Sequence, residues 1–445
     1  CTRLGSTTGT PLDVGNCYNL KYLDISNTSV PALTTTNCSY LTHVNISKSL
    51  ISSINYAHLQ SLKTVQINDC SRLTSVVIDS CQGITDLNIA NNPALREVRL
   101  DNCKKLRTIV VNNVQDLELF QINNCESLKT IRIVKANSLK SIDLSGAEGL
   151  ETLDISTIPI ETITFGTIST LKNLDVSNNT AIRAIDFGES ASVLENFKIT
   201  GCENLKTIDN LNLLIKNYEQ TQIFRGNDYI QRVTGTIAFG DEITSARDLF
   251  RGCIDLEVAP KLKLNNVTVL SAMFYDCTNL KRAPELDTRN VTDTSYMFYG
   301  CEMLEAVPAY DTSNVTNLSY MFTRCSSILS TYSYKLNSTT SVQGMFKECY
   351  SLDTVLDMDT KHIKNFSEMF MDCSKVQYLP SFNTSSATNM YYFLDGCTQL
   401  RTIPAFDTSK VTNFSRAFSR CEFLTNLPSF DTSSAVNRSY MLYGN

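Results

Sequence analysis

Residues 301–325 read CEMLEAVPAYDTSNVTNLSYMFTRC, and this stretch decides the fold. Its pattern is C-x-x-L-x-x-x-P-x-ϕ-D-T-S-x-V-T-N-x-S-x-M-F-x-x-C, where ϕ is an apolar residue, and it returns every 24 residues. The cysteines that mark the copies are Cys253, Cys277, Cys301, Cys325, Cys349, Cys373, Cys397 and Cys421. A fixed period of roughly 20–50 residues is typical of a solenoid, in which each repeat is one coil stacked on the last. The sequence therefore predicts a repeat solenoid.

The first half of the chain has a shorter unit, C-x-x-L-x-x-ϕ-x-ϕ-x-N, as in residues 103–113 (CKKLRTIVVNN). Units start about 11 residues apart, so two units make one coil of 21–22 residues. Apolar residues alternate at the end of each unit, which predicts an extended segment on each of two faces. The Asn that closes many units is expected to form a buried ladder whose amides bind turn backbone. This half is predicted to be mostly β.

The second half has room for two elements in each 24-residue coil. The Pro-containing part is predicted to be extended, because Pro lacks a donor and favours strand edges and turns. The part that reads T-x-x-S-x-M-F-x-x-C is predicted to be a short helix, with a Thr such as Thr292 as its N-cap. Met297, Phe298 and Cys301 would then lie on one buried side. We therefore expect an α/β solenoid with 24-residue coils here.

The domain organisation follows from where each repeat ends. Residues 217–222 (NYEQTQ) break the leucine pattern, and a degenerate 24-residue copy starts at Tyr229. We expect a short leucine-rich-repeat solenoid over 1–209, a junction over 210–228 and a second solenoid over 229–445. Cys1 opens another C-x-x-L, and Asn445 stands where the next Cys is due. Because neither end reads as a cap, we expect a segment of a longer protein or a larger assembly through uncapped ends.

All sixteen cysteines occupy the motif C-x-x-[LIV]. Equivalent positions of stacked coils lie about 4.8 Å apart with parallel side chains, whereas disulfides need converging Cβ atoms about 3.8 Å apart. We therefore interpret the row from Cys253 to Cys421 as a structural ladder of buried thiols, which behave as compact hydrophobes. Some disulfides remain an alternative. A metal site has little support, since no C-x-x-C is present and no His lies near a Cys.

Two further rows are candidates for function. Tyr296, Tyr320, Tyr392 and Tyr440 share the position before Met, and an exposed Tyr row would be a natural ligand-binding surface. The alternative is that these rings only cover a helix edge. The second row contains Asp287, Asp311, Asp359, Asp407 and Asp431. A calcium row is one interpretation, but Lys263 and Lys335 in the same position favour Asx turns.

Composition excludes several functions. The net charge is −6, which argues against nucleic acid as the main partner. The sequence contains no run of about 18 apolar residues, so it predicts no membrane-spanning helix. The three His residues stand alone, and no phosphate-binding loop, dinucleotide fingerprint or zinc-protease motif occurs. The sequence therefore predicts no enzyme and no metal or cofactor.

The copies at residues 406–421 (FDTSKVTNFSRAFSRC) and 310–325 (YDTSNVTNLSYMFTRC) resemble the BspA-type leucine-rich-repeat surface proteins of bacteria. This resemblance covers about residues 229–445. Asn19–Leu33 (NLKYLDISNTSVPAL) is similar to the short cysteine-bearing leucine-rich repeats of internalin-J-type adhesins. The resemblance implies an extracellular, cell-surface protein that adheres to host proteins, other cells or glycans. It implies no catalytic residues.

The function predicted from these features is a non-catalytic, secreted adhesion solenoid. It would bind a protein or glycan ligand on another cell or a host surface through its repeat faces. The alternative is a structural spacer or assembly component of a surface layer, stalk or virion. The cheapest sign of an enzyme would be a pocket with converging carboxylates, and nothing in the sequence points to a carboxylate pair.

Overall fold

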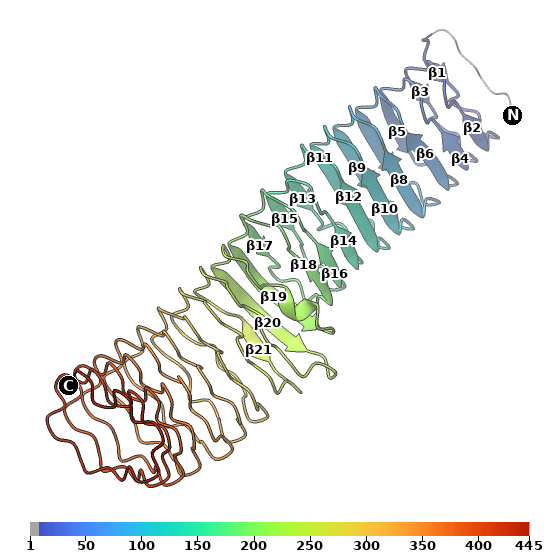
Figure 1. The fold of residues 1–445 in the computed structure, drawn as a ribbon. Helices are drawn as coiled ribbons and strands as arrows, with labels where there is room; N and C mark the ends of the chain where they lie inside the picture. The colour runs from blue at the N-terminus through green and yellow to red at the C-terminus, as the bar shows by residue number, and fades with distance from the viewer. Residues whose placement is uncertain (1–8, 445) are drawn as a thin grey trace. The chain divides into compact units, whose positions relative to one another are not determined.

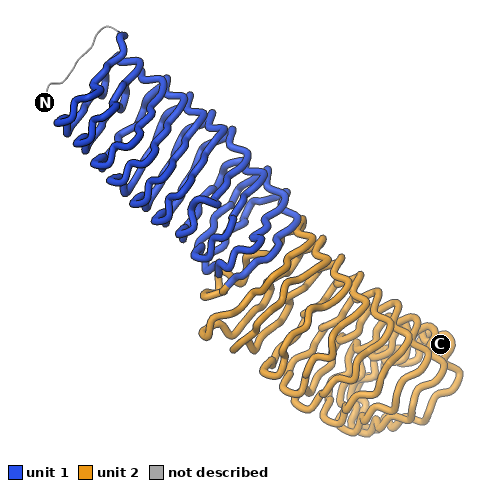
Figure 2. The backbone as a smooth tube through the Cα atoms, turned by 180° about the vertical axis from the view of Figure 1, so that it is seen from behind, with its two compact units in different colours: residues 1–213 blue, residues 214–445 orange. Residues whose placement is uncertain are grey.

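The computed structural model describes residues 9–444, so the predictions on Cys1 and Asn445 lie outside the described residues. The chain divides into two compact units, residues 1–213 and residues 214–445 (Figure 2). Within each unit the chain winds as stacked coils, and segments one repeat apart lie side by side (Figure 1). The predicted leucine-rich-repeat solenoid is confirmed.

The first unit carries strands on two faces of its coils. One face is a nine-stranded parallel sheet of β2 (Tyr22–Asp24), β4 (His43–Asn45), β6 (Thr64–Asn68), β8 (Asp86–Ala90), β10 (Thr108–Asn112), β12 (Thr130–Val134), β14 (Thr152–Asp154), β16 (Asn173–Asp175) and β18 (Asn196–Lys198). The other face holds a six-stranded sheet of β5 (Ser53–Ala57), β7 (Ser75–Asp79), β9 (Glu97–Asp101), β11 (Leu119–Asn123), β13 (Ser141–Asp143) and β15 (Thr162–Thr164). The pairs β1 (Leu12–Asp13) with β3 (Leu33–Thr34) and β17 (Ala184–Asp186) with β19 (Thr207–Ile215) are separate from these two sheets.

The strand register follows the repeat of the sequence. Thr108 pairs with Asp86 on one side and with Thr130 on the other, which is one 22-residue coil in each direction. In β10 the side chains of Ile109 and Val111 are fully buried, and those of Thr108, Val110 and Asn112 are half-buried. Alternate side chains of each strand therefore point into the core, and the side chains between them point toward the surface. The mostly β first half is confirmed.

The closing Asn residues take a different role from the one predicted. Asn102, Asn113 and Asn124 have φ between 51 and 56°, the left-handed region that Asn tolerates better than most residues. Their amides donate to side chains of the preceding coil rather than to turn backbone: Asn124 Nδ2 donates to Asn102 Oδ1 at 3.0 Å. These side chains are exposed or half-buried. The prediction of a buried ladder is therefore wrong for this row.

The second unit has few regular strands. It contains η1 (Gln220–Gln222), β20 (Arg232–Phe239) and β21 (Lys261–Lys263), and β20 pairs with β21 in parallel. Beyond β21 the coils are joined by single parallel bridges 24 residues apart, such as Val269 to Asp293 and Asn389 to Asn413. Among residues 9–444 there is no α-helix. The short helices predicted for each 24-residue coil, and with them the α/β class of this half, are wrong.

The hydrogen bonds of one coil show why no helix forms. The N–H groups of Tyr296 and Phe298 donate to the carbonyls of Ser319 and Met321 in the next coil, at 3.0 and 2.9 Å. Only the amides between them close turns within the coil, as Met297 N does to Thr294 O at 3.1 Å. A helix needs every amide for its own carbonyls. Alternate amides are instead shared between coils, so the segment folds as linked turns.

The predicted N-cap role of the Thr row is also wrong. Thr292 Oγ1 donates to the backbone carbonyl of Thr268, one coil earlier, at 3.3 Å. The same bond recurs from Thr316 to Thr292, at 3.1 Å. These hydroxyls therefore link neighbouring coils.

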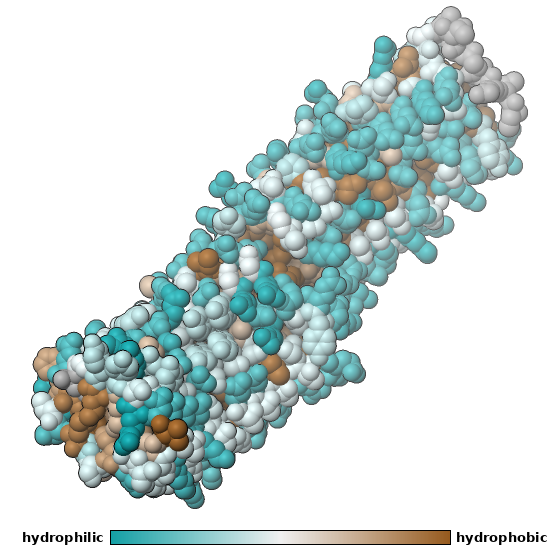
Figure 3. All heavy atoms as spheres, viewed as in Figure 1, coloured by the Kyte–Doolittle hydropathy of each residue, from teal (hydrophilic) through white to brown (hydrophobic). Residues whose placement is uncertain are grey.

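Apolar side chains fill the inside of both stacks, and hydrophilic residues cover most of the face seen in Figure 3. In the second unit the largest fully buried side chains are Phe rings. Phe250, Phe274, Phe298, Phe322, Phe346 and Phe370 form a column with ring centroids 5.3–5.7 Å apart. No helix in the described part of the chain is long and apolar enough to cross a membrane.

Candidate functional site

The cysteines of the second unit line its core. The Cys253–Cys421 row is fully buried, and none of its thiols is joined in a disulfide. Each thiol donates to a carbonyl of the preceding coil, as Cys301 Sγ does to Phe274 O at 3.1 Å. Burial raises the pKa of Cys253, Cys349 and Cys421 to about 12. These thiols are therefore neutral at physiological pH.

Thiol labelling should separate this row from the exposed Cys17. A pKa of about 12 lowers the thiolate fraction at pH 8 by roughly a thousandfold relative to an ordinary thiol. We expect iodoacetamide to label Cys17 in the native protein and the Cys253–Cys421 row only after unfolding. Mass spectrometry of the peptides measures this. Native-state labelling of Cys349 at the rate of Cys17 would contradict the burial.

The four predicted Tyr residues occupy a backbone position with positive φ. The values are 57° for Tyr296, 56° for Tyr320, 53° for Tyr392 and 57° for Tyr440. The left-handed conformation costs an L-residue about 1–2 kcal/mol. The hydrogen bonds impose this conformation: the N–H of Tyr296 donates to the next coil, and the carbonyl of Tyr296 accepts from the N–H of Tyr299. Gly344 has the same conformation one coil after Tyr320.

The structure places these residues in two groups. The rings of Tyr296 and Tyr320 stack, with centroids 5.0 Å apart and planes 18° apart. In the second group the guanidinium of Arg416 lies between Tyr392 and Tyr440, 5.5 and 5.1 Å from their ring centroids. The groups are separated by the coils of Gly344 and Glu368, which occupy the same position in the repeat. The Tyr residues therefore do not form one continuous row.

A second Tyr row was missed by the sequence reasoning. Tyr275 and Tyr299 stand two residues before Cys277 and Cys301, and their rings stack with centroids 4.6 Å apart and planes 5° apart. Arg251, one coil earlier, lies 4.3 Å from the Tyr275 centroid. The signal in the sequence is a 24-residue spacing of Arg251, Tyr275 and Tyr299. That spacing could have identified the row.

The two rows meet at Tyr296. Its ring centroid lies 6.0 Å from that of Tyr299 and 6.5 Å from that of Tyr275. Tyr296 is 38 % exposed, and the other rings are half-buried. We call Tyr275, Tyr296, Tyr299 and Tyr320 the tyrosine surface. It spans three consecutive coils of the second unit.

Polar groups surround the tyrosine surface. The Tyr320 hydroxyl accepts a hydrogen bond from Gln343 Nε2 at 2.7 Å, and burial raises its pKa to about 12. Lys347 pairs with Glu368 at 2.7 Å, and Arg324 pairs with Glu302 at 3.3 Å. Charges of both signs therefore frame an aromatic centre. This arrangement is typical of protein-recognition surfaces, which have an apolar core and a polar rim.

Farther along the unit, a buried carboxylate occupies the repeat position that Tyr275 and Tyr299 hold in earlier coils. Asp395 stands two residues before Cys397 and is fully buried. It is bound by the Ser419 hydroxyl and by the Arg420 guanidinium. Arg420 also donates to Asp372 Oδ1 at 2.9 Å, and the pairing with Asp395 raises the pKa of Arg420. This cluster was not identified from the sequence, because nothing there showed that position 395 is buried.

The Asp row forms local turns. Asp311 Oδ1 accepts hydrogen bonds from the backbone N–H and the hydroxyl of Ser313, at 3.0 and 2.7 Å. These bonds lower the pKa of Asp311. Asp407 repeats the arrangement with Ser409. This geometry is that of the Asx turn. In the described residues no group of three or more His, Cys, Asp or Glu is placed to hold a metal ion.

Two family models match parts of the chain. One, described as a Mycoplasma protein of unknown function (DUF285), matches residues 244–357, 268–381 and 340–445. The other, described as the leucine-rich-repeat domain of the endo-beta-N-acetylglucosaminidase EndoS, matches residues 111–179. The first match lies over the residues that resemble the BspA type. None of the curated proteins matches the chain.

Three bacterial structures are similar to the chain. A leucine-rich-repeat protein from Bacteroides ovatus is 14 % identical, with 92 % of this chain and 91 % of that chain covered and a TM-score of 0.26. One from Eubacterium ventriosum is 13 % identical, with coverages of 91 % and 83 % and a TM-score of 0.29. The functional domain of InlJ from Listeria monocytogenes, which includes a cysteine ladder, is 14 % identical, with coverages of 76 % and 73 % and a TM-score of 0.24.

Proposed function

Because this chain is a leucine-rich-repeat solenoid whose repeats resemble those of BspA-type and internalin-J-type proteins, we propose that it is a non-catalytic adhesion protein that binds its ligand through the tyrosine surface. The proposal assigns it to the outside of the cell, at a cell surface. Its ligand is a protein or glycan on another cell or host surface, and binding requires no cofactor.

The observation that carries this proposal is the conformation of the Tyr residues. Tyr296 and Tyr320 are held at positive φ, where Gly344 serves the same backbone position without a side chain. A bulky residue in a strained conformation is a reason to look for function. The core does not require these rings, because Met297 and Phe298 already fill it. Tyr is also enriched at the centres of interfaces.

A double substitution tests the tyrosine surface. We expect Tyr296→Asn with Tyr320→Asn to lower ligand affinity by at least about tenfold, since a central aromatic residue often contributes more than about 1.4 kcal/mol. Asn tolerates positive φ, so the urea midpoint of unfolding should stay close to that of the parent chain. Binding is measured on an array of purified extracellular proteins and glycans with the intact chain.

Tyr378→Asn is the matched control, because Tyr378 is 58 % exposed in the same unit but lies in the Pro-containing part of its coil. It should bind like the parent. Unchanged binding by the double variant would remove the tyrosine surface from the function. An intact chain that binds nothing on the array would favour the spacer role.

A further inference from the structure

The first unit contains a cavity where its coil stacking is interrupted. Along one face β5 to β15 form a continuous sheet, but β3 pairs only with β1 and is not part of that sheet. The coils are still joined just before this point, where Ser52 N donates to Pro31 O at 3.0 Å. A cavity of about 560 Å³ lies next to the interruption, lined by Tyr18, residues 33–39, Asn55 and residues 57–59. Its volume is typical of small-molecule sites, roughly 300–1,000 Å³.

Two changes in the repeat account for the interruption. Tyr56 fills an inward position that Val14, Thr35 and Ile78 occupy in neighbouring coils, and its fully buried ring needs more room than they do. At the corner, Asn37 Nδ2 donates to Asn16 Oδ1 at 2.9 Å, which joins the first two coils. His58 takes the same corner position in the third coil, with φ 60°, and has no amide to continue the ladder.

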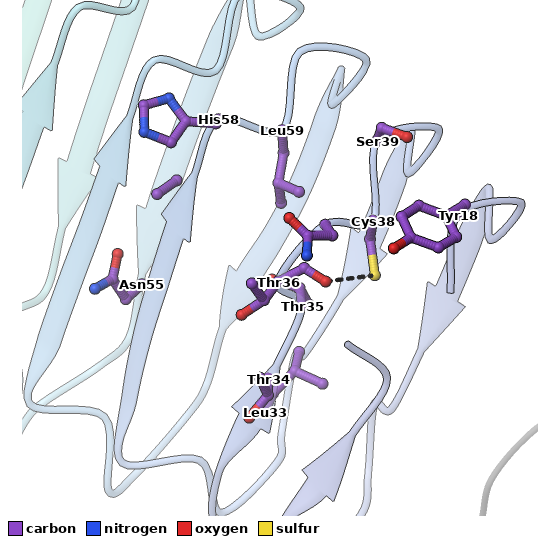
Figure 4. A pocket seen from close by; sticks show the side chains of 12 residues that line it. Tyr18, Leu33, Thr34, Thr35, Thr36, Cys38, Ser39, Asn55, His58 and Leu59 are labelled. Carbon is purple, nitrogen blue, oxygen red and sulfur yellow. Dashed lines mark hydrogen bonds between the residues drawn. The ribbon is translucent and has the colours of Figure 1, made fainter. Parts of the chain in front are cut away.

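The side chains around the cavity come from three consecutive coils. In Figure 4, Asn55 and His58 lie on one side, Tyr18 lies on the other and Thr34–Thr36 lie between them. Thr34, Thr36 and Asn55 are exposed, and their side chains make no hydrogen bond to another described residue. Donors and acceptors without protein partners therefore converge on one hollow.

The chemistry of the lining restricts the ligand. The described residues around the cavity include no Asp, Glu, Lys or Arg, so apart from the His58 imidazole nothing there would balance a charged ligand. Hydroxyl and amide groups exchange hydrogen bonds with hydroxyls in both directions. The ring of Tyr18 and the side chain of Leu33 add apolar surface. An extended peptide fits less well, because β3 is only two residues long and offers a short backbone edge.

We propose that this cavity binds a neutral saccharide of one or two rings, in which each ring is a hexose or an N-acetylhexosamine. The amide of Asn55 and the hydroxyl of Thr36 hydrogen-bond its hydroxyls from two adjoining coils. The Tyr18 ring packs against its C–H surface. The site is separate from the tyrosine surface and does not depend on the function proposed for it.

Saturation-transfer NMR on the intact chain tests the proposal. The probes are glucose, galactose, mannose, N-acetylglucosamine, lactose and cellobiose, with galacturonate as a charged comparison and a neutral Ser/Thr/Asn peptide as a competing class. We expect at least one neutral sugar to bind. We expect Asn55→Ala to weaken its binding about tenfold, because one hydrogen-bonding side chain is lost. Thr36→Val removes only a hydroxyl and should act in the same direction.

Gln121→Ala is the matched control. Gln121 occupies the register position of Asn55 three coils away, through Val77 and Arg99. It should leave sugar binding unchanged, as should the Tyr296→Asn, Tyr320→Asn double variant. The proposal is overturned if no neutral sugar of the panel binds. It is also overturned if Asn55→Ala with Thr36→Val binds like the parent, or if only galacturonate or the peptide binds at these residues.

Discussion

Phe322→Ala should lower the free energy of unfolding of the second unit by about 3–5 kcal/mol. Phe322 is fully buried, and its ring stacks on Phe298 and Phe346 with centroids 5.7 and 5.5 Å away. Removing it leaves a cavity in the middle of the column, which both neighbouring coils line. Each coil of a solenoid is stabilised mainly by its neighbours. We therefore also expect the unfolding transition to broaden or split.

Urea denaturation followed by circular dichroism measures both effects. Phe423→Ala is the matched control, because Phe423 is 49 % exposed in the same unit. It should change the free energy of unfolding by less than about 0.5 kcal/mol. A loss of less than about 1 kcal/mol for Phe322→Ala would show that the column is not tightly packed.

The second large effect concerns the buried carboxylate. Arg420→Met should cost about 3–5 kcal/mol, because it leaves Asp395 buried with no cation beside it. Asp372 would lose the same partner, since Arg420 now donates to it at 2.9 Å. The cost should be local to the coils around Cys397 and Cys421. Hydrogen exchange of the amides in these coils measures it.

Two variants sharpen this test. Arg324→Met changes the equivalent position in a coil where the charges are exposed, and its pairing with Glu302 is 3.3 Å long. Exposed ion pairs contribute roughly 0–1 kcal/mol, so this variant should be nearly neutral. Asp395→Thr added to Arg420→Met should restore most of the stability, because Thr323 already occupies that position in a buried state. Equal costs for Arg420→Met and Arg324→Met would contradict the proposed role of the pair.

The two halves of the chain differ in how well sequence reasoning worked. In β10 the alternation of Ile109 and Val111 indicated a strand, and the strand is present. Around Met297, Phe298 and Cys301 the apolar spacing indicated a helix, and the structure has linked turns. A helix and a set of linked turns would both bury these three residues, so the burial pattern does not distinguish the two conformations. The decisive factor is the partner of each alternate amide, which lies in the next coil.

The candidate site was only partly accessible from sequence. Tyr296 and Tyr320 were found because they repeat in register, and Tyr275 and Tyr299 could have been found in the same way. The contact between the two rows could not, since it depends on how each coil turns between positions 296 and 299. The interruption beside Thr34–Thr36 depends on how a buried Tyr56 ring fits over the coil beneath it.

By itself the sequence determined that this protein is a leucine-rich-repeat solenoid, how long its coils are and which residues face the core. It could do so because a stacked coil must present the same apolar positions at every repeat. Tertiary structure decided the backbone of the 24-residue coils, the left-handed conformation of the Tyr and Asn rows, and the places where ladders break. These features depend on hydrogen bonds and ring contacts between residues about one coil apart, and local sequence preference does not specify them.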